Sequence, residues 1–107
     1  MEARRAGRVI TNFSAEIIYR DKRYAGSIEN LSPVGAYVVT APTQSAGDFA
    51  PHSLLEIRFQ FPAGEDITLD CKVIWSYSTP PHGYTHSIGV EIIDPPSTYQ
   101  EILKTLL

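Results

Sequence analysis

The sequence predicts a mainly all-β domain, a six-stranded antiparallel β-barrel followed by a short C-terminal helix. Short runs with alternating or β-branched residues recur along the chain, and turn-forming residues separate them at spacings typical of all-β domains. The alternation of strands and helices that a parallel sheet requires is missing from the pattern. Helical periodicity is confined to the last residues, 97–107.

The first half of the chain predicts three strands. The runs Phe13–Arg20, Arg23–Glu29 and Val34–Thr40 are rich in β-branched and aromatic residues. Asp21-Lys22 is predicted to form a tight hairpin turn between the first two strands, and residues 30–33 join the second strand to the third.

The second half predicts three more strands between two loops. Residues 41–52 hold two prolines, a glycine and several small polar residues, so we expect a loop before the strand Leu54–Phe61. The clearest alternation of the sequence follows, with Ile67, Leu69, Cys71, Val73 and Trp75 on one face. This pattern predicts a half-buried strand in which Trp75 belongs to the core. A second loop is expected over 76–84, and Thr85–Ile93 is the last strand.

A helix is predicted after Asp94-Pro95-Pro96, which ends the last strand. Ser97 is a good N-cap, and Gln100 stands three residues later at the spacing of a capping box. The apolar residues of this segment fall on one helical face; they are Tyr99, Ile102, Leu103 and Leu106. We expect this helix to plug or flank the barrel.

Length and composition predict one domain over residues 1–107, with a flexible N-terminal arginine arm (1–12), a barrel (13–93) and a C-terminal helix (97–107). A chain of this size has room for one core. No apolar stretch is long enough to span a membrane, and the first eight residues are polar and basic, unlike a signal peptide, so we expect a cytoplasmic protein without membrane insertion. Cys71 is the only cysteine, which excludes an internal disulfide and favours a small buried side chain.

Charge is distributed unevenly. The formal net charge of -3 argues against a general binder of DNA or RNA, since that activity needs a broad cationic surface. Arg4, Arg5 and Arg8 nevertheless lie close together at the N-terminus. We therefore expect an anionic partner to be small and to bind at this arm.

Two short patterns have chemistry suited to an anionic purine ligand. Arg4 and Arg8 stand four residues apart, and arginine matches phosphate oxygens or the O6/N7 edge of guanine with a planar fork. In the second pattern, Asn30 supplies amide donors and an acceptor, Ser32 adds a hydroxyl, and Gly35 allows close backbone approach or a positive φ. The arm would clamp phosphates while this segment reads base edges.

These two patterns, in this order, resemble the defining motifs of the PilZ family, Arg-x-x-x-Arg followed by Asp/Asn-x-Ser-x-x-Gly. The family fold is likewise a six-stranded antiparallel barrel, and Val73-Ile74-Trp75 and Ile88-Gly89-Val90-Glu91 are similar to its closing strand pair. The resemblance implies a receptor for the bacterial second messenger cyclic di-GMP that signals through a partner protein, with no cofactor or metal. It also implies the site residues: Arg4 and Arg8 on phosphates and guanine, opposite Asn30, Ser32 and Gly35, with Arg5 and Trp75 as secondary candidates.

Other interpretations remain open. The chain is alternatively a PilZ-fold interaction adaptor for motility, pilus or secretion machinery that does not bind the nucleotide. Taken singly, the arginines suit a solvated tail, and Asn30 to Gly35 suits a plain turn. No catalytic motif is recognisable, so we expect no enzyme. His82 and His86 have four-residue spacing, but the prolines between the last two strands deny them the helix that a metal site would need.

Overall fold

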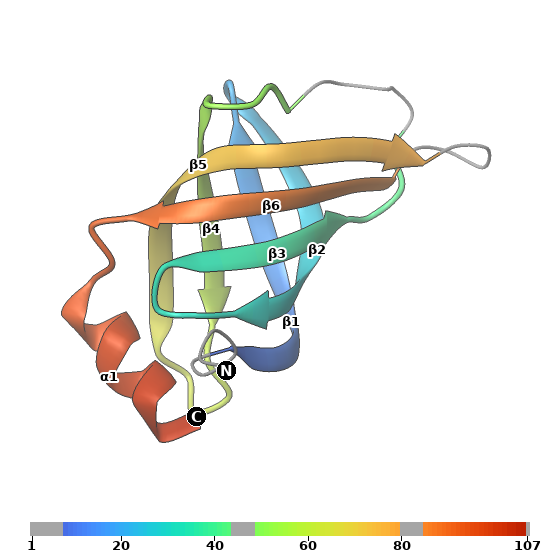
Figure 1. The fold of residues 1–107 in the computed structure, drawn as a ribbon. Coiled ribbons are helices and arrows are strands. Elements are labelled where there is room, and N and C mark those ends of the chain that lie inside the picture. The colour runs from blue at the N-terminus through green and yellow to red at the C-terminus, as the bar shows by residue number, and fades with distance from the viewer. Residues whose placement is uncertain (1–7, 44–48, 80–84, 107) are drawn as a thin grey trace.

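The structure, a computed structural model, describes residues 8–43, 49–79 and 85–106, and within them six strands close into an antiparallel barrel with a helix at its end (Figure 1). The strands follow one another around the barrel in the order β1-β2-β3-β6-β5-β4, and β4 pairs back onto β1. Their bounds are β1 Val9–Tyr19, β2 Lys22–Leu31, β3 Gly35–Thr40, β4 Leu54–Gln60, β5 Asp66–Thr79 and β6 Thr85–Ile93. The predicted fold class is confirmed.

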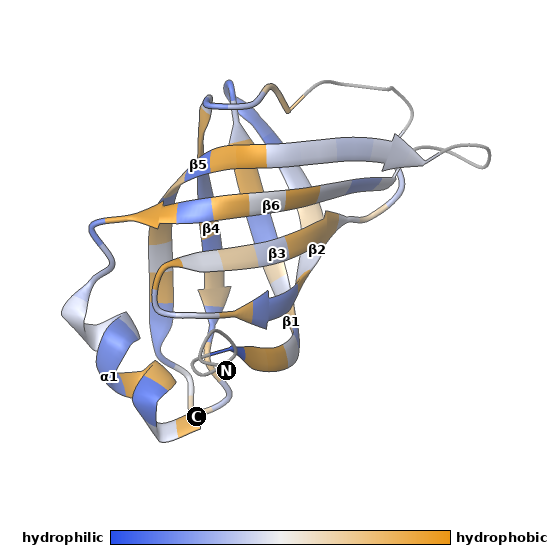
Figure 2. Cartoon of the chain, viewed as in Figure 1, coloured by the Kyte–Doolittle hydropathy of each residue, from blue (hydrophilic) through white to orange (hydrophobic). Residues whose placement is uncertain are grey.

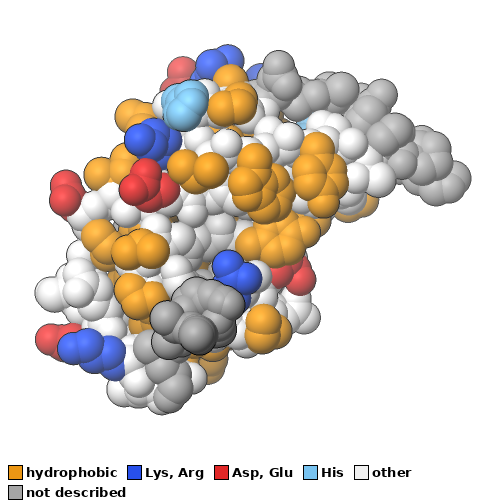
Figure 3. Space-filling view, in the orientation of Figure 1, with side chains coloured by type: hydrophobic (Ala, Val, Ile, Leu, Met, Phe, Trp, Pro, Cys, Tyr) orange, Lys and Arg blue, Asp and Glu red, His pale blue; other side chains and the backbone are white. Residues whose placement is uncertain are grey.

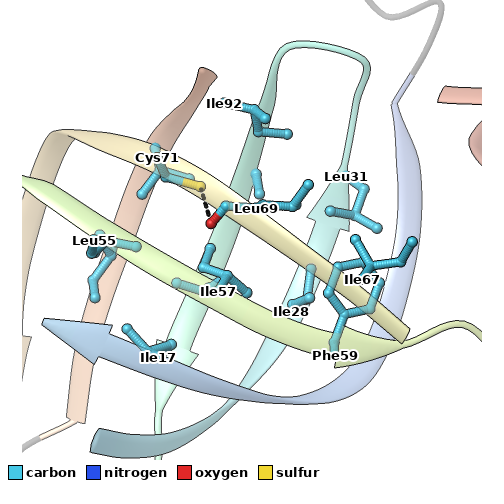
Figure 4. Packing of buried hydrophobic residues seen from close by; sticks show 14 of the residues in the cluster. Ile17, Ile28, Leu31, Leu55, Ile57, Phe59, Ile67, Leu69, Cys71 and Ile92 are labelled. Atoms are coloured by element: carbon cyan, nitrogen blue, oxygen red, sulfur yellow. Dashed lines mark hydrogen bonds between the residues drawn. The ribbon is translucent and has the colours of Figure 1, made fainter. Parts of the chain in front are cut away.

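The core follows the alternation of the strands. Along β5, Ile67, Leu69, Cys71 and Val73 are buried, while the residues between them face outward, which gives the alternating colours along the strands of Figure 2. Figure 4 shows Ile67, Leu69 and Cys71 of this strand among labelled residues of β1, β2 and β4 inside the barrel. The Cys71 thiol donates to the carbonyl of Leu69 at 3.7 Å. Cys71 is 1% exposed, as predicted, and burial raises the pKa of its thiol to about 12, with a smaller contribution from the charge of Asp70.

Helix α1, Ser97–Leu106, closes one end of the barrel (Figure 1). Tyr99 and Leu103 are its buried residues, and the Tyr99 ring stacks on Phe61 with 6.2 Å between centroids. The predicted capping box does not form as expected, because the Gln100 side chain donates to the carbonyl of Pro95 instead of accepting from the backbone of Ser97. The helix is held mainly by its apolar face.

Two predictions for the N-terminal strands need correction. The first strand begins at Val9 and not at Phe13, so residues 9–12, which were expected in the arm, belong to the barrel. Val9 and Ile10 pair with Leu31 and Asn30 at the end of β2, and the Thr11 hydroxyl donates to the carbonyl of Ile28 at 2.6 Å. The hairpin turn lies at Arg20-Asp21, one residue before the predicted position. Both residues have positive φ, 51° and 67°, as a two-residue turn of matching twist requires.

The outer end of β5 also differs from prediction. The strand continues to Thr79, so the first four residues of the loop expected at 76–84 are instead paired with β6, ending with the pair Thr79 and Thr85. This extension carries the ends of β5 and β6 beyond the rest of the barrel (Figure 1). The prolines that suggested a loop lie at 80 and 81, outside the described residues.

Trp75 faces solvent, contrary to the predicted burial, and is 42% exposed. The cause is a bulge in β5: Val73 pairs with Val90 and Trp75 pairs with Gly89, so Ile74 is an extra residue with no partner position of its own. The extra residue reverses the facing of the side chains that follow it. Trp75 therefore lies on the outside of the barrel.

Candidate ligand-binding site

One surface pocket brings together most of the predicted site residues. It has a volume of about 450 Å³ and is lined by Arg8, Asn30, Ser32, Gly35 and Trp75, together with Val34, Ala36, Tyr37, Ile74, Gly89, Val90 and Glu91. The start of β1, the end of β2 and the outer face of β3, β6 and β5 meet there. Arg4 and Arg5 lie outside the described residues.

Arg8 is positioned by the pairing of the first two strands. It immediately precedes β1, whose first residue, Val9, pairs with Leu31 of β2. The arginine is exposed and forms no ion pair within the described part of the chain. The β1–β2 register thus brings a guanidinium from the N-terminal segment beside the residues of the second motif.

Asn30 lies within β2, not in the join where its sequence context suggested it. It pairs with Ile10 on one side and Tyr37 on the other, next to an irregularity of the β2–β3 register. Its side chain is half-buried, and its amide makes no hydrogen bond to any described residue. Both amide donors and the carbonyl acceptor are therefore available to a ligand.

Ser32 holds the turn between β2 and β3. Its hydroxyl oxygen accepts from the backbone N–H of Gly35 at 3.0 Å and of Val34 at 3.3 Å, and its O–H donates to the Gly35 carbonyl at 3.3 Å. The Ser32 hydroxyl therefore makes its hydrogen bonds within the turn. A turn without a ligand-binding role would show the same hydrogen bonds. The position of Ser32 in the pocket wall is nevertheless the predicted one.

The same turn is anchored to the helix. The Tyr99 hydroxyl donates to the Ser32 carbonyl at 2.6 Å, although 67 residues separate the two in sequence. Burial raises the pKa of Tyr99, with a smaller contribution from Cys71, so the phenol remains a neutral donor. The buried Tyr99 side chain thereby holds the β2–β3 turn in place beside the pocket.

Gly35 is required because two strands approach closely. A Cβ at this position would lie 2.9 Å from the backbone carbonyl oxygen of Val90 on β6. Among the described glycines only Gly64 has a positive φ, so of the two predicted reasons for Gly35, close approach is the one that applies.

An aromatic surface forms the other side of the pocket, and sequence reasoning missed most of it. The Trp75 ring covers Gly89, where a Cβ would come within 2.4 Å of the ring atoms. Tyr37 lies against Trp75 at 5.6 Å between centroids and Tyr77 stacks on it at 5.8 Å, so hydrophobic side chains gather on the face seen in Figure 3. The available signal was Gly89 itself, since a glycine inside a strand pattern indicates close approach.

The pocket also contains a charge that the motifs do not include. Glu91 lies on β6 directly opposite Gly35, and Lys72 of β5 lies on its other side with 3.6 Å between Nζ and Oε1. Among the described residues that line the pocket, Arg8 is the cation and Glu91 the anion. The site is therefore mixed in charge.

The arrangement of Arg8 beside the Asn-x-Ser-x-x-Gly residues on a six-stranded barrel agrees with the family comparison, in which the PilZ domain model matches residues 2–107. The chain belongs to the PilZ domain family. PilZ domains are binding and adaptor domains, and no catalytic family is indicated. No curated protein matches the sequence.

Solved structures share the fold of this PilZ domain. The inhibitor of motility of Bacillus subtilis (MotI/DgrA) is similar with a TM-score of 0.76 and 16% identity, over 99% of this chain and 50% of the other. This chain thus spans half the length of that protein. The PilZ domain of YcgR from Escherichia coli, solved with c-di-GMP, gives 0.72 and 14% identity over 98% and 92% of the two chains. The PilZ domain of CeSA from a cellulose-synthesising bacterium gives 0.62 and 19% identity over 94% and 95%.

Other sites on the described surface have less to support them. A larger depression of about 650 Å³ over β1, β4 and β5 includes none of the predicted residues. Within the described ranges, no group of three His, Cys, Asp or Glu side chains is arranged to hold a metal ion. His86 is buried and its ring contacts the hydroxyls of Ser78 and Thr43. No helix in the described part of this domain is long and apolar enough to cross a membrane.

Proposed function

We propose that this PilZ domain is a cytoplasmic receptor for cyclic di-GMP, in which the nucleotide fixes the N-terminal arm against the barrel and a partner protein recognises the resulting surface. The observation that carries the proposal is the convergence of Arg8, Asn30, the Ser32–Gly35 turn and an exposed Trp75 in one pocket. The YcgR domain of the same fold, solved with c-di-GMP, supports it.

Each residue has a distinct role in the proposal. Arg8 and Arg4 meet phosphates and the O6/N7 edge of guanine, because a guanidinium fork matches both. Asn30 offers its unpaired amide to the base, and Trp75 offers an aromatic face for stacking. Ser32 and Gly35 keep the wall of the pocket in shape, and Arg5 adds positive charge.

The magnitudes are compatible with micromolar affinity. A charge-assisted hydrogen bond contributes about 1.5–3 kcal/mol, and stacking of a base on an aromatic ring about 1–3 kcal/mol. A few such contacts exceed the ~8 kcal/mol that corresponds to a micromolar Kd, and the excess offsets the entropy of fixing the arm.

Isothermal titration calorimetry tests the proposal, with cyclic di-GMP as ligand and GMP and cyclic di-AMP as controls. We expect selective low-micromolar binding, and a loss of about tenfold or more in Arg4→Ala and in Arg8→Ala. Arg23→Ala is the matched control, because Arg23 lies at the opposite end of β2 from Asn30 and pairs with Glu16. Unchanged affinity in both arm variants would contradict the proposed site.

A second candidate function is an adaptor that docks on a protein without the nucleotide. The observation in its favour is the exposed apolar surface of β5, where Ile74 is 47% and Tyr77 59% exposed beside Trp75. Lack of binding at hundreds of micromolar cyclic di-GMP in the same titration would favour this function over the receptor.

A further inference from the structure

Glu91 lies in the wall of the proposed site. On β6 it alternates with buried Val90 and Ile92 and so points outward, on the same face as Gly89. Its cross-strand neighbours are Gly35 on β3 and Lys72 on β5. Its side chain is 54% exposed, lies within salt-bridge distance of Lys72 and lines the pocket.

A carboxylate is an unfavourable neighbour for the negatively charged phosphates of the ligand, so its presence in this pocket needs a chemical reason. Lys72 offsets the charge only in part, since an exposed pair at 3.6 Å interacts weakly. An ionised carboxylate accepts hydrogen bonds and donates none. The part of the ligand that suits Glu91 is therefore a group with two adjacent donors.

Guanine carries such a group. Its N1–H and its exocyclic 2-amino group lie side by side and match the two oxygens of a carboxylate, whereas adenine presents the N1 lone pair there. The O6/N7 edge, which suits an arginine, remains free when a carboxylate holds N1 and the 2-amino group. A pocket lined by both Arg8 and Glu91 has partners for both edges of one guanine.

The floor of the pocket allows this arrangement. Gly35 and Gly89 add no side chain of their own to the outer face of β3 and β6, and the Trp75 ring lies over Gly89. Glu91 follows Gly89 by two residues on the same strand face, a distance of about 7 Å at the rise of an extended strand. A base stacked on Trp75 thus has the Glu91 carboxylate beside its edge.

We propose that Glu91 is the residue that selects guanine, by accepting hydrogen bonds from N1–H and from the 2-amino group of one base of the ligand. This inference rests on the proposed function and names the specificity of the same pocket.

The test compares cyclic di-GMP with cyclic di-IMP, which lacks only the 2-amino groups, by calorimetry on the wild type and on Glu91→Ala and Glu91→Gln. The wild type should prefer cyclic di-GMP by about tenfold, the effect of one charge-assisted hydrogen bond. In Glu91→Ala the preference should fall below about threefold, through weaker binding of cyclic di-GMP. Glu101→Ala, an exposed change on α1, should retain the wild-type preference.

The outcomes separate this inference from the receptor proposal. If the wild type binds cyclic di-GMP but both Glu91 variants keep its preference, or bind it as tightly as the wild type, the role of Glu91 is refuted and the receptor stands. If the wild type binds neither nucleotide, both proposals fail. Circular dichroism of the near-isosteric Glu91→Gln variant separates lost recognition from lost folding.

Discussion

Gly89 and Gly35 determine the shape of the pocket through the side chains they lack. At Gly35 the neighbour of an added Cβ is a backbone carbonyl, which moves only with the strand. At Gly89 it is the Trp75 indole, which sits at the surface and can swing away. The two glycines are thus sensitive to substitution for different reasons, one through strand pairing and the other through the position of an aromatic ring.

Gly89→Ala should displace Trp75 and weaken cyclic di-GMP binding by about fivefold or more, because the added methyl occupies the place of the ring. Trp75 is the only tryptophan, so its fluorescence emission reports the displacement directly. Gly64→Ala provides the contrast. It has no atom within 4 Å of an added Cβ but has φ of 104°, so it should lower stability and leave emission and affinity unchanged.

Individual site residues were predictable to different extents. The structure brings Arg8, Asn30, Ser32 and Gly35 into one pocket, and the order and chemistry of two short motifs were enough to group them from the sequence. The facing of Trp75 was wrong because the bulge at Ile74 depends on pairing with β6. The place of Glu91 in the wall of this pocket was not predicted, since only strand register places it opposite Gly35.

At the scale of elements, a hydrogen bond connects the turn between β2 and β3 to helix α1. Within the turn, the Ser32 hydroxyl oxygen accepts a hydrogen bond from the Gly35 N–H. The Tyr99 hydroxyl donates a hydrogen bond to the Ser32 carbonyl. The Ile92 N–H also donates to the Val34 carbonyl at 2.8 Å, which ties the turn to β6. The pocket rim therefore depends on packing at the end of the barrel.

Tyr99→Phe should lower the free energy of unfolding by about 1–3 kcal/mol, because the Ser32 carbonyl loses its donor while the ring packing is kept. Urea denaturation measures this change, and calorimetry should show weaker nucleotide binding because the turn is less well held. Tyr24→Phe is the control, since the Tyr24 hydroxyl has no hydrogen bond to a described residue. Equal effects of the two substitutions would argue against the coupling.

Strands and helix were largely predictable as elements, and their ends were not. The alternation from Ile67 to Val73 and the apolar face of the helix are local patterns that agree with the final burial. The extensions of β1 to Val9 and of β5 to Thr79 depend on pairing with β2 and β6, because the extended residues themselves show no clear strand pattern. The turn lies at Arg20-Asp21 because these two residues adopt positive φ, and the residue types alone did not indicate that Arg20 would do so.

For the whole molecule, closure of the sheet buries the thiol of Cys71 in the core. The Cys71 thiol has a pKa of about 12 in the folded state against an ordinary value of 9.0, because its thiolate is desolvated there. The folded state therefore holds this proton more tightly than the unfolded chain does. Its contribution to stability is complete below pH 9 and is lost as the pH rises toward 12.

The free energy of unfolding should accordingly fall above pH 9, with Cys71 contributing a slope of up to about 1.4 kcal/mol per pH unit. Urea titrations between pH 8 and about 10.5 measure it. In Cys71→Ala the slope should be shallower by this amount, because the variant lacks the thiol. Parallel curves for wild type and variant would contradict a buried, proton-retaining thiol.

The pairing of Val9 with Leu31 has a consequence for affinity that involves no contact with the ligand. This pairing holds Arg8, the residue before Val9, at the pocket. Arg4 precedes Arg8 by four residues, and four residues of extended chain span at most roughly 14 Å, so Arg4 can act only within that distance of Arg8. A tethered group of this kind acts at an effective concentration in the millimolar range. Lengthening the chain between Arg8 and β1 with glycines would dilute the arginines and weaken binding while every ligand contact remained possible.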